Sequence, residues 1–229
     1  MINNYLAVIS AYNEAEHISK VVRMARRYLP VLVVDDGSED ETYQLVQQSG
    51  AEVLRLETNQ GKGAALRIGF QRALELGYAA VITLDGDGQH DPREIRKFLQ
   101  VYAQDPVDLI IGKRNFHQMP LVRRLANNTG KWLFSWAVGQ SIPDNQSGYR
   151  MLGRHFMECL LDSTESGFEF EVEMLTVCLK YHFSLRWIPI RTIYSGESSH
   201  INPLKHFVNF LRITWITRQK MRTPEVVWW

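Results

Sequence analysis

The sequence predicts an α/β protein with a mostly parallel β-sheet flanked by helices. Short apolar runs alternate with segments of helical spacing through the first half of the chain. Each apolar run ends at a loop rich in acidic, small or basic residues. This alternation is typical of βαβ units, in which the carboxyl ends of the parallel strands meet at one edge of the sheet. We therefore expect the loops after the strands to build a binding site.

Five apolar runs in the first half of the chain predict strands. They are too short for buried helices and are separated by turn residues or helical segments. Two further strand-like pieces, 184–188 and 191–194, lie in the second half. The five runs are 5–10, 31–34, 51–56, 79–84 and 107–111.

Helices are predicted between the strands of the first half. Residues 15–28 carry apolar side chains at helical spacing, and Ser38 or Asp40 can cap a second helix that runs to Gln48. A glycine-punctuated loop, TNQGKGAAL, leads into a third helix. Pro92 suits the first turn of a fourth.

The composition excludes several classes of protein. The 229 residues are 45% hydrophobic and 22% charged, which suits a folded domain with a sizeable core. A formal net charge of +1 gives no general attraction for nucleic acid. The two cysteines form no C-x-x-C pair and predict neither a disulfide framework nor a zinc site. This cysteine usage favours the reducing cytosol, so we expect a cytoplasmic protein. No signal peptide or apolar run of about 18 residues is evident, so we expect any membrane contact to be peripheral.

The second half contains two basic segments rich in apolar and aromatic residues. Residues 109–143 and 202–222 contain no Asp or Glu. The second reads as an amphipathic helix, which either packs on the domain or lies on an anionic membrane surface. We place a domain boundary here, with one domain over 1–196 and a basic helix and tail over 197–229. One face of this helix should carry Leu204, Phe207, Val208, Leu211 and Trp215.

The segment TLDGDGQHDP predicts a metal site at the end of the fourth strand. Asp85, Asp87 and the amide of Gln89 offer the oxygen ligands that hard divalent cations prefer, so we expect Mg²⁺ or Mn²⁺. Taken alone, the same residues are equally compatible with a solvated Asp-Gly turn.

Two other loops at the predicted edge suit a nucleotide diphosphate. Asp35 and Asp36 follow the second strand, where carboxylates can accept hydrogen bonds from a base or ribose. Lys62 stands between two glycines at a helix start, where backbone N–H groups and the ammonium can hold a phosphate. The simpler interpretations are a helix cap and a flexible turn. No G-x-G-x-x-G follows the first strand, which argues against a dehydrogenase.

Five motifs together resemble family 2 glycosyltransferases of the GT-A fold, and most closely the dolichyl-phosphate or polyprenyl-phosphate mannosyltransferase branch. They are SAYNEAE, VVDDGSEDET, GKGAAL, TLDGDGQHDP and DNQSGYR, and they occur in the order found in that family. The resemblance spans about 5–194. It implies a metal-dependent enzyme that transfers a hexose from a nucleotide-diphosphate sugar to a polyprenyl phosphate with inversion.

The resemblance assigns roles to individual positions. The residues expected to bind the nucleotide are Ala11, Tyr12, Glu14, Asp35 and Asp36. Asp85, Asp87 and Gln89 match the metal-binding set. Arg114 and Arg124 match the positions that hold the lipid phosphate, and arginine suits that task because its planar fork makes two charge-assisted hydrogen bonds. Asp144, Gln146 and Arg150, in DNQSGYR, are expected to line the active site.

Alternatives remain open at this stage. A saccharide or protein hydroxyl as acceptor would need a general base, which Glu169, Glu171 or Glu173 could supply, although we expect these three to be solvated helix residues. A non-catalytic nucleotide-binding or membrane adaptor module is a third interpretation. The expected partners are the sugar donor, the lipid acceptor and the cytosolic face of a membrane, but not nucleic acid. A membrane-protein partner or a homo-oligomer is left open.

Overall fold

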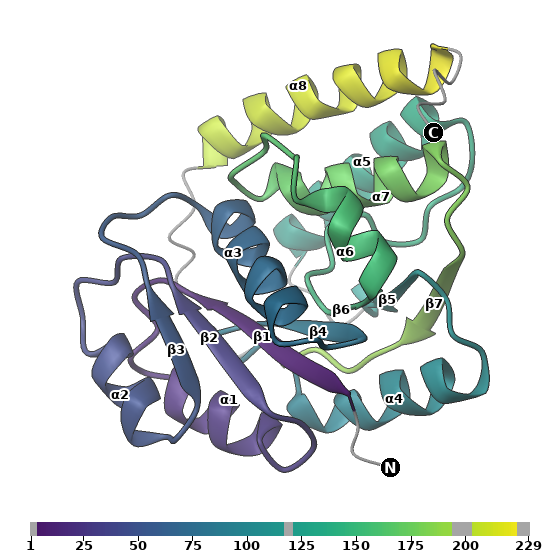
Figure 1. Cartoon of the computed structure of the whole chain (residues 1–229). Helices are drawn as coiled ribbons and strands as arrows, with labels where there is room; N and C mark the ends of the chain where they lie inside the picture. The colour runs from purple at the N-terminus through teal and green to yellow at the C-terminus, as the bar shows by residue number, and fades with distance from the viewer. Residues whose placement is uncertain (1–3, 117–120, 194–202, 224–229) are drawn as a thin grey trace.

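A computed structural model of the chain describes residues 4–116, 121–193 and 203–223. Within these ranges the chain forms a central β-sheet with helices on both faces, as Figure 1 shows. The predicted α/β class with a mostly parallel sheet is confirmed.

The sheet has seven strands in the order β3-β2-β1-β4-β6-β5-β7. Every neighbouring pair is parallel except the two that involve β6, which runs antiparallel between β4 and β5. Ser10 of β1 pairs with Asp85 of β4, so the loops after these strands emerge side by side. The strands are β1 (Tyr5–Ala11), β2 (Val31–Asp35), β3 (Glu52–Arg55), β4 (Ala80–Asp85), β5 (Leu109–Lys113), β6 (Arg150–Gly153) and β7 (Leu185–Pro189).

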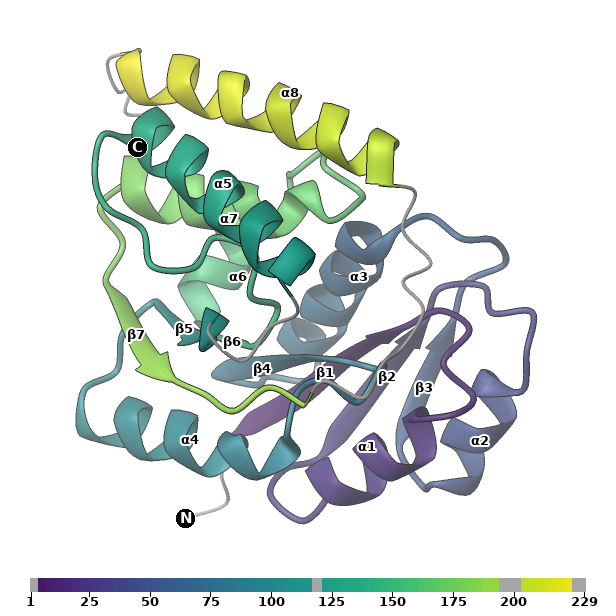
Figure 2. The same cartoon turned by 180° about the vertical axis from the view of Figure 1, so that it is seen from behind.

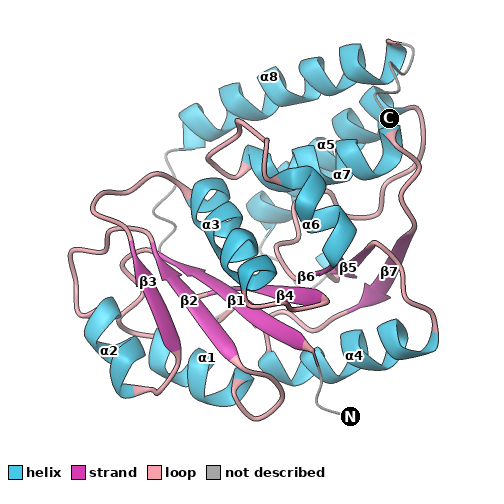
Figure 3. Ribbon diagram, in the orientation of Figure 1, coloured by secondary structure: helices cyan, strands magenta, loops and turns pink. Residues whose placement is uncertain are grey.

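Helices cover the two faces of the sheet as separate layers, which the drawings show from behind (Figure 2) and from the front (Figure 3). Apolar residues of α1, α2 and α4 form one core with the sheet, and those of α3, α5, α6, α7 and α8 form the other. Alternate residues of β1 point into opposite cores: Val8 joins the second and Ile9 the first. The helices are α1 (Ile18–Ala25), α2 (Thr42–Gln48), α3 (Lys62–Glu75), a 3₁₀ turn η1 (Pro92–Glu94), α4 (Ile95–Gln104), α5 (Leu121–Val138), α6 (Arg154–Leu160), α7 (Glu169–Lys180) and α8 (Pro203–Arg222).

Several predicted boundaries differ from the observed ones. The third strand is shorter than 51–56, and the fifth lies two residues later than 107–111. Strand β6 was not predicted, because its four residues follow a polar motif without a distinct apolar run. Of the two strand-like pieces, the first is β7, whereas in 191–193 only an isolated bridge from Thr192 to His90 forms. Position 194 lies outside the described residues.

Asp40 and Asp91 help to begin helices. Asp40 accepts the N–H of Thr42 at 2.9 Å, whereas Ser38 accepts a hydrogen bond from Asn13 and does not cap α2. Asp91 accepts the N–H of Arg93 at the start of η1, as expected for an aspartate that precedes a proline-initiated turn.

Helix α8 packs on the domain through a face other than the predicted apolar one. Phe210 and Ile213 are 6% and 2% exposed and belong to the same core as α5 and α7. Val208, Leu211 and Trp215, which the sequence placed on the apolar face, are exposed. The predicted boundary between 196 and 197 lies outside the described residues, as do the side chains at 204 and 207. No helix in the described ranges is long and apolar enough to cross a membrane.

Candidate active site

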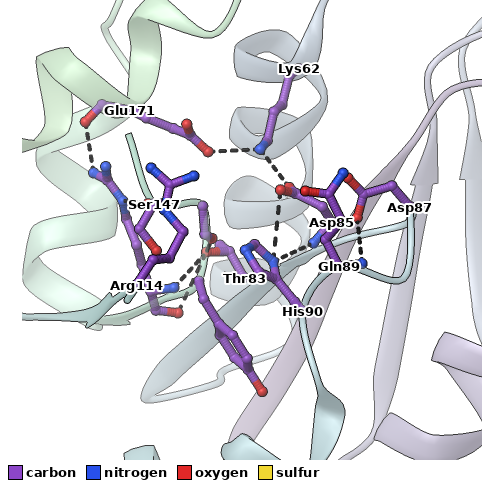
Figure 4. Close-up of polar contacts among 12 residues, drawn as sticks. Lys62, Thr83, Asp85, Asp87, Gln89, His90, Arg114, Ser147 and Glu171 are labelled. Atoms are coloured by element: carbon purple, nitrogen blue, oxygen red, sulfur yellow. Dashed lines mark hydrogen bonds and ion pairs between the residues drawn. The ribbon is translucent and has the colours of Figure 1, made fainter. Parts of the chain in front are cut away.

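Asp85 lies at the carboxyl end of β4, at the centre of a group of charged side chains (Figure 4). Its Oδ1 atom is 2.5 Å from Nζ of Lys62, at the start of α3. The same ammonium lies 2.7 Å from Oε1 of Glu171 on α7. The Lys62 and Glu171 side chains are only 13% and 5% exposed, so one cation balances two carboxylates largely away from water. We call these three residues the Lys62 cluster.

The charges of the Lys62 cluster stabilise one another. Burial alone would raise the pKa of Asp85, but Lys62, His90 and Arg114 together outweigh it and lower that pKa to about 2. Burial likewise opposes the charge of Lys62, yet Asp85 and Glu171 raise the pKa of its ammonium above the usual value. Asp85 and Lys62 are therefore both ionised at neutral pH.

Gly148 lies directly against the Lys62 cluster. A Cβ atom at this position would be 2.6 Å from Oε1 of Glu171 and 2.8 Å from Nζ of Lys62. Its distance from Oδ2 of Asp85 would be 3.0 Å. Only glycine leaves room for all three side chains, which explains the Ser-Gly step of DNQSGYR.

His90 supports Asp85 from the other side as a neutral imidazole. Its Nδ1 atom accepts the backbone N–H of Asp85 at 3.2 Å, and a nitrogen that accepts a hydrogen bond carries no proton. Burial lowers the pKa of His90 to about 4, against the opposing attraction of Asp85. The ring also packs against Tyr149 in a tilted arrangement, with centroids 5.0 Å apart. His90 thus fixes the end of β4 without adding charge.

The predicted metal ligands fit a hard divalent cation in chemistry. Asp85 and Asp87 supply carboxylates and Gln89 an amide, all on one tight turn in which Asp87 accepts the backbone N–H of Gln89 at 2.9 Å. Three oxygen donors do not fill an octahedral shell, and the described residues hold no group of three or more Asp, Glu, His or Cys side chains arranged for a metal. The set suits a cation that takes its remaining ligands from water and a diphosphate.

Arg114, at the end of β5, lies close enough that its charge lowers the pKa of Asp85. Two hydrogen bonds of 2.8 Å, from Nε and Nη2, hold its guanidinium on the fully buried carboxylate of Asp144. Asp144 also accepts the backbone N–H groups of Arg114 and Gln146. The site therefore combines a carboxylate pair suited to a metal with a rigidly oriented arginine suited to a phosphate.

The comparison with known families agrees with this arrangement. A model of the family "Glycosyl transferase family 2" matches residues 6–161. The chain belongs to glycosyltransferase family 2. The predicted enzyme class and family are thereby confirmed.

Relatives of this glycosyltransferase include enzymes named for lipid-phosphate acceptors. It is 29% identical to the UDP-N-acetylglucosamine–dolichyl-phosphate N-acetylglucosaminyltransferase of Methanococcus voltae, over 83% of the chain and 86% of the relative. It is 33% identical to the undecaprenyl-phosphate mannosyltransferase of Micrococcus luteus, over 74% and 75%. The resemblance to the polyprenyl-phosphate branch is therefore confirmed.

A solved structure shows the same fold. Glucosyl-3-phosphoglycerate synthase of Mycobacterium tuberculosis, crystallised with Mn²⁺ and UDP-glucose, superposes with a TM-score of 0.73 at 17% identity. The match covers 97% of this glycosyltransferase and 80% of the solved chain. The GT-A fold inferred from the sequence is confirmed.

The two expected nucleotide loops of the glycosyltransferase are fastened together. The backbone N–H of Asn13, which has a φ of 55°, donates to Ser38, and that of Glu14 donates to Thr42 at 2.7 Å. Ala11, buried at the end of β1, accepts the N–H of Asp36. Tyr12 follows on the partly exposed side. The loops after β1 and β2 therefore form one wall at the sheet edge.

Asp35 and Asp36 are engaged by the protein itself. Asp36 is 3% exposed, and its two carboxylate oxygens accept the N–H groups of Gln60 and Gly61, each at 2.8 Å. Asp35 is fully buried and accepts the N–H of Ser38. Asp36 thus ties the β2 loop to the glycine loop, a supporting role that the sequence did not reveal.

The glycine loop corrects the prediction of a phosphate cradle. The N–H groups of Gly63 and Ala64, which we expected to hold a phosphate, donate instead to the carbonyl oxygen of Ser166 at 2.6 and 3.2 Å. A Cβ on Gly61 would lie 2.5 Å from that same carbonyl oxygen, so glycine is required for this close approach. In the structure the glycine loop binds the 163–168 segment through these hydrogen bonds and places Lys62 next to Asp85.

The remaining predicted residues occupy different positions around this site. Arg150 is 1% exposed, and its guanidinium donates to the carbonyl oxygens of Ser147 and Glu171 at 2.8 and 2.7 Å. It therefore fixes the Glu171 backbone from beneath the site. Gln146 lies beside α5, near Gly130. Arg124 is half-buried on α5, and among the described residues no hydrogen bond joins it to the Lys62 cluster.

The glutamates of α7 contradict the expectation of a solvated face. Glu169, Glu171 and Glu173 are 8%, 4% and 7% exposed, because α3 and α8 both pack on this helix. Glu173 pairs with Lys220 of α8 at 3.0 Å, just as Glu171 pairs with Lys62. Apolar residues on every side of α7 were the available signal, since a helix that is apolar all round is buried.

Proposed function

We propose that this glycosyltransferase moves a hexose from a nucleotide-diphosphate sugar to a polyprenyl phosphate, with inversion at the anomeric carbon. The observation that carries the proposal is the proximity of Asp85 to Arg114, which is held on buried Asp144. This arrangement offers places for two phosphate-bearing substrates, one beside the carboxylates through a metal and one on the arginine. The named activities of the lipid-phosphate relatives support the same assignment.

Asp85, Asp87 and Gln89 would hold Mg²⁺ or Mn²⁺, which neutralises the charge that develops on a leaving diphosphate. The nucleotide would lie along the wall made by Ala11, Tyr12, Glu14, Asp35 and Asp36. The donor nucleotide is of the GDP-mannose or UDP-glucose type. Solved neighbours crystallised with Mn²⁺ or Mg²⁺ and UDP are consistent with this.

Arg114, which follows β5, would orient the acceptor phosphate. Arg124, near the start of α5, would supply a second positive charge. One phosphate oxygen attacks the anomeric carbon and forms the new C–O bond, while the bond to the diphosphate breaks and its electron pair leaves with the nucleotide. Because the acceptor phosphate is already an anion, the step needs no general base. Arg150 and Gln146 would keep this part of the site in place.

The test is a donor screen with radiolabelled sugar nucleotides and a short polyprenyl phosphate, scored by label in the organic phase. Asp85→Asn and Asp87→Asn should each reduce transfer by at least ~100-fold with metal present. Asp105→Asn, which removes an exposed carboxylate paired with Arg186, is the matched control and should retain transfer. Full activity in both site variants would refute the metal assignment.

Glu171 favours a second candidate, transfer to a hydroxyl acceptor. Its buried carboxylate shares the Lys62 ammonium with Asp85, and a hydroxyl acceptor needs a base. Its carboxylate is already held by the Lys62 ammonium at 2.7 Å and would have to leave that ion pair to accept a proton, which is why we rank this candidate second. Arg114→Ala and Arg124→Ala discriminate, because neither should matter with a soluble hydroxyl acceptor.

We place the enzyme at the cytosolic surface of a membrane. Helices α5 and α8 lie side by side, and Arg218 of α8 donates to the carbonyl oxygen of Trp136 on α5 at 3.0 Å. Both helices carry exposed apolar side chains, and Lys131 and Arg218 line the same surface hollow as two of the tryptophans. Tryptophan beside basic residues suits the headgroup region of an anionic bilayer. The exposed apolar residues are Leu125, Trp132, Trp136, Val208, Leu211 and Trp215.

A further inference from the structure

Lys62 makes an unusually close pair with the residue expected to bind the metal. Its Nζ atom lies 2.5 Å from Oδ1 of Asp85, and this contact takes the face of the carboxylate that is directed at α3 (Figure 4). Oδ1 is buried and has no other hydrogen-bonding partner. The second oxygen, Oδ2, lies on the His90 side, 3.7 Å from its Nδ1.

We propose that Lys62 is a built-in counter-cation that competes with the metal for Asp85. The inference rests on the metal site of the proposed function and adds a determinant of its affinity. An ammonium and a divalent cation repel each other, so both cannot lie within contact distance of the same carboxylate oxygen without a large cost. Lys62 takes Oδ1, so the metal would bind through Oδ2, where its charge weakens the Lys62–Asp85 pair.

The surroundings of Lys62 show where the displaced ammonium remains. Glu171 holds it at 2.7 Å from the side opposite Asp85, and the ring of Phe168 lies 5.5 Å from Nζ, within the range of a cation–π contact. A small rotation towards these two groups leaves the ammonium paired. Arg150 fixes the backbone carbonyl of Glu171, which keeps this alternative partner in position.

The arrangement also explains why a buried Lys–Asp–Glu group is present in a metal site. Without Lys62, two carboxylates of the Lys62 cluster would face each other with no counter-charge, a costly state for largely buried groups. Lys62 removes that cost in the metal-free enzyme and weakens metal binding in exchange. Glu171 limits the weakening, because it draws the ammonium away from Asp85.

Mn²⁺ titration followed by electron paramagnetic resonance tests this competition without substrate or turnover. Lys62→Met should bind Mn²⁺ about tenfold or more tightly than the wild type. It should also gain more thermal stability from added Mn²⁺, since the metal replaces the missing charge. Lys97→Met is the control and should leave Mn²⁺ affinity unchanged. It removes a lysine whose Nζ lies 2.6 Å from Oε2 of Glu94, close to the 2.5 Å of the Lys62–Asp85 pair.

A second variant keeps the test informative if Lys62→Met folds poorly. Glu171→Gln removes the alternative partner and should weaken Mn²⁺ binding, because Lys62 is then held by Asp85 alone. If this effect operates through Lys62, it disappears in the Lys62→Met, Glu171→Gln double variant. An effect of equal size in both backgrounds would show that Glu171 acts directly on the metal and would refute the proposal.

Unchanged Mn²⁺ affinity in Lys62→Met would overturn the inference about Lys62. The proposal that the enzyme transfers a hexose would still stand. Absence of Mn²⁺ binding in every protein, together with metal-independent transfer, would overturn both the inference and the metal assignment. Tighter binding in Lys62→Met combined with weaker binding in Glu171→Gln supports the competition.

Discussion

The guanidinium of Arg114 and the carboxylate of Asp144 form a two-pronged ion pair, with both hydrogen bonds 2.8 Å long. Asp144 is fully buried and Arg114 is 12% exposed, so the ion pair holds the arginine side chain in one orientation beside the site. A residue oriented in this way acts on a substrate with little loss of side-chain freedom.

Asp144→Asn should therefore impair transfer through Arg114. The substituted amide cannot accept both guanidinium bonds, and a displaced arginine orients the acceptor phosphate poorly. We expect transfer to fall by about 100-fold, with a raised KM for polyprenyl phosphate and little change for the nucleotide sugar. Asp105→Asn disrupts an exposed Arg–Asp pair and serves as the control. Equal effects on both substrates would indicate general damage to the site instead.

Gly148→Ala should damage the Lys62 cluster directly. The added methyl group would lie within 3.0 Å of atoms of Glu171, Lys62 and Asp85, so at least one of these side chains must move. We expect at least a tenfold loss of transfer with the fold retained, measured by activity and circular dichroism. Gly153→Ala is the matched control, since a Cβ there meets no atom closer than 3.5 Å. Wild-type activity in Gly148→Ala would show that the cluster tolerates rearrangement.

The rule that strand ends of a parallel sheet meet at one edge predicted where the loops would lie, and Asp85 and Arg114 do lie at the ends of β4 and β5. The role expected of Arg114 came from the family resemblance. The rule says nothing about contacts from distant helices. Glu171 was assigned to a solvated face although apolar residues on every side of α7 indicated a buried helix, and the packing of α3 and α8 against α7 shows its burial.

The glycine loop shows a second limit of reading sequence. Gly61 and Gly63 resemble a phosphate-binding turn, and the turn does open α3. What occupies its N–H groups is the carbonyl of Ser166, about a hundred residues later in the chain, and no local pattern encodes that contact. Likewise, helical spacing on α8 identified an apolar face, but packing buried Phe210 and Ile213 instead.

His90 makes stability depend on pH in a predictable direction. Its pKa is about 4 in the folded protein, below the ordinary 6.5, so the unfolded chain binds a proton more readily between these values. The stabilisation is present above pH 6.5 and is lost as the pH falls towards 4, at a cost of roughly 3 kcal/mol. Asp85, with a pKa of about 2, adds a further loss only below its ordinary value of 3.8.

His90→Asn should flatten this profile. Asparagine can accept the N–H of Asp85 but does not titrate, so the free energy of unfolding should change less between pH 7 and 4 than in the wild type. Urea denaturation in buffer with EDTA measures it without interference from metal. His155→Asn, at an exposed position on α6, should keep the wild-type slope. An unchanged slope in His90→Asn would assign the acid sensitivity to other groups.

The exposed tryptophans of α5 and α8 should govern binding to anionic bilayers. Trp132 and Trp215 are 67% and 60% exposed, so replacing them with alanine removes little from the core. In flotation with vesicles containing phosphatidylglycerol, we expect the partition coefficient of the double variant to be about tenfold or more below that of the wild type. Its transfer of sugar to a short, detergent-dispersed polyprenyl phosphate should persist. Tyr181→Ala, at a 53% exposed aromatic residue that ends α7 and lies on neither α5 nor α8, is the control. Since bilayer attraction also uses the basic residues near these tryptophans, binding of the wild type should weaken with added salt. Undiminished flotation of the double variant would exclude this surface as the membrane contact.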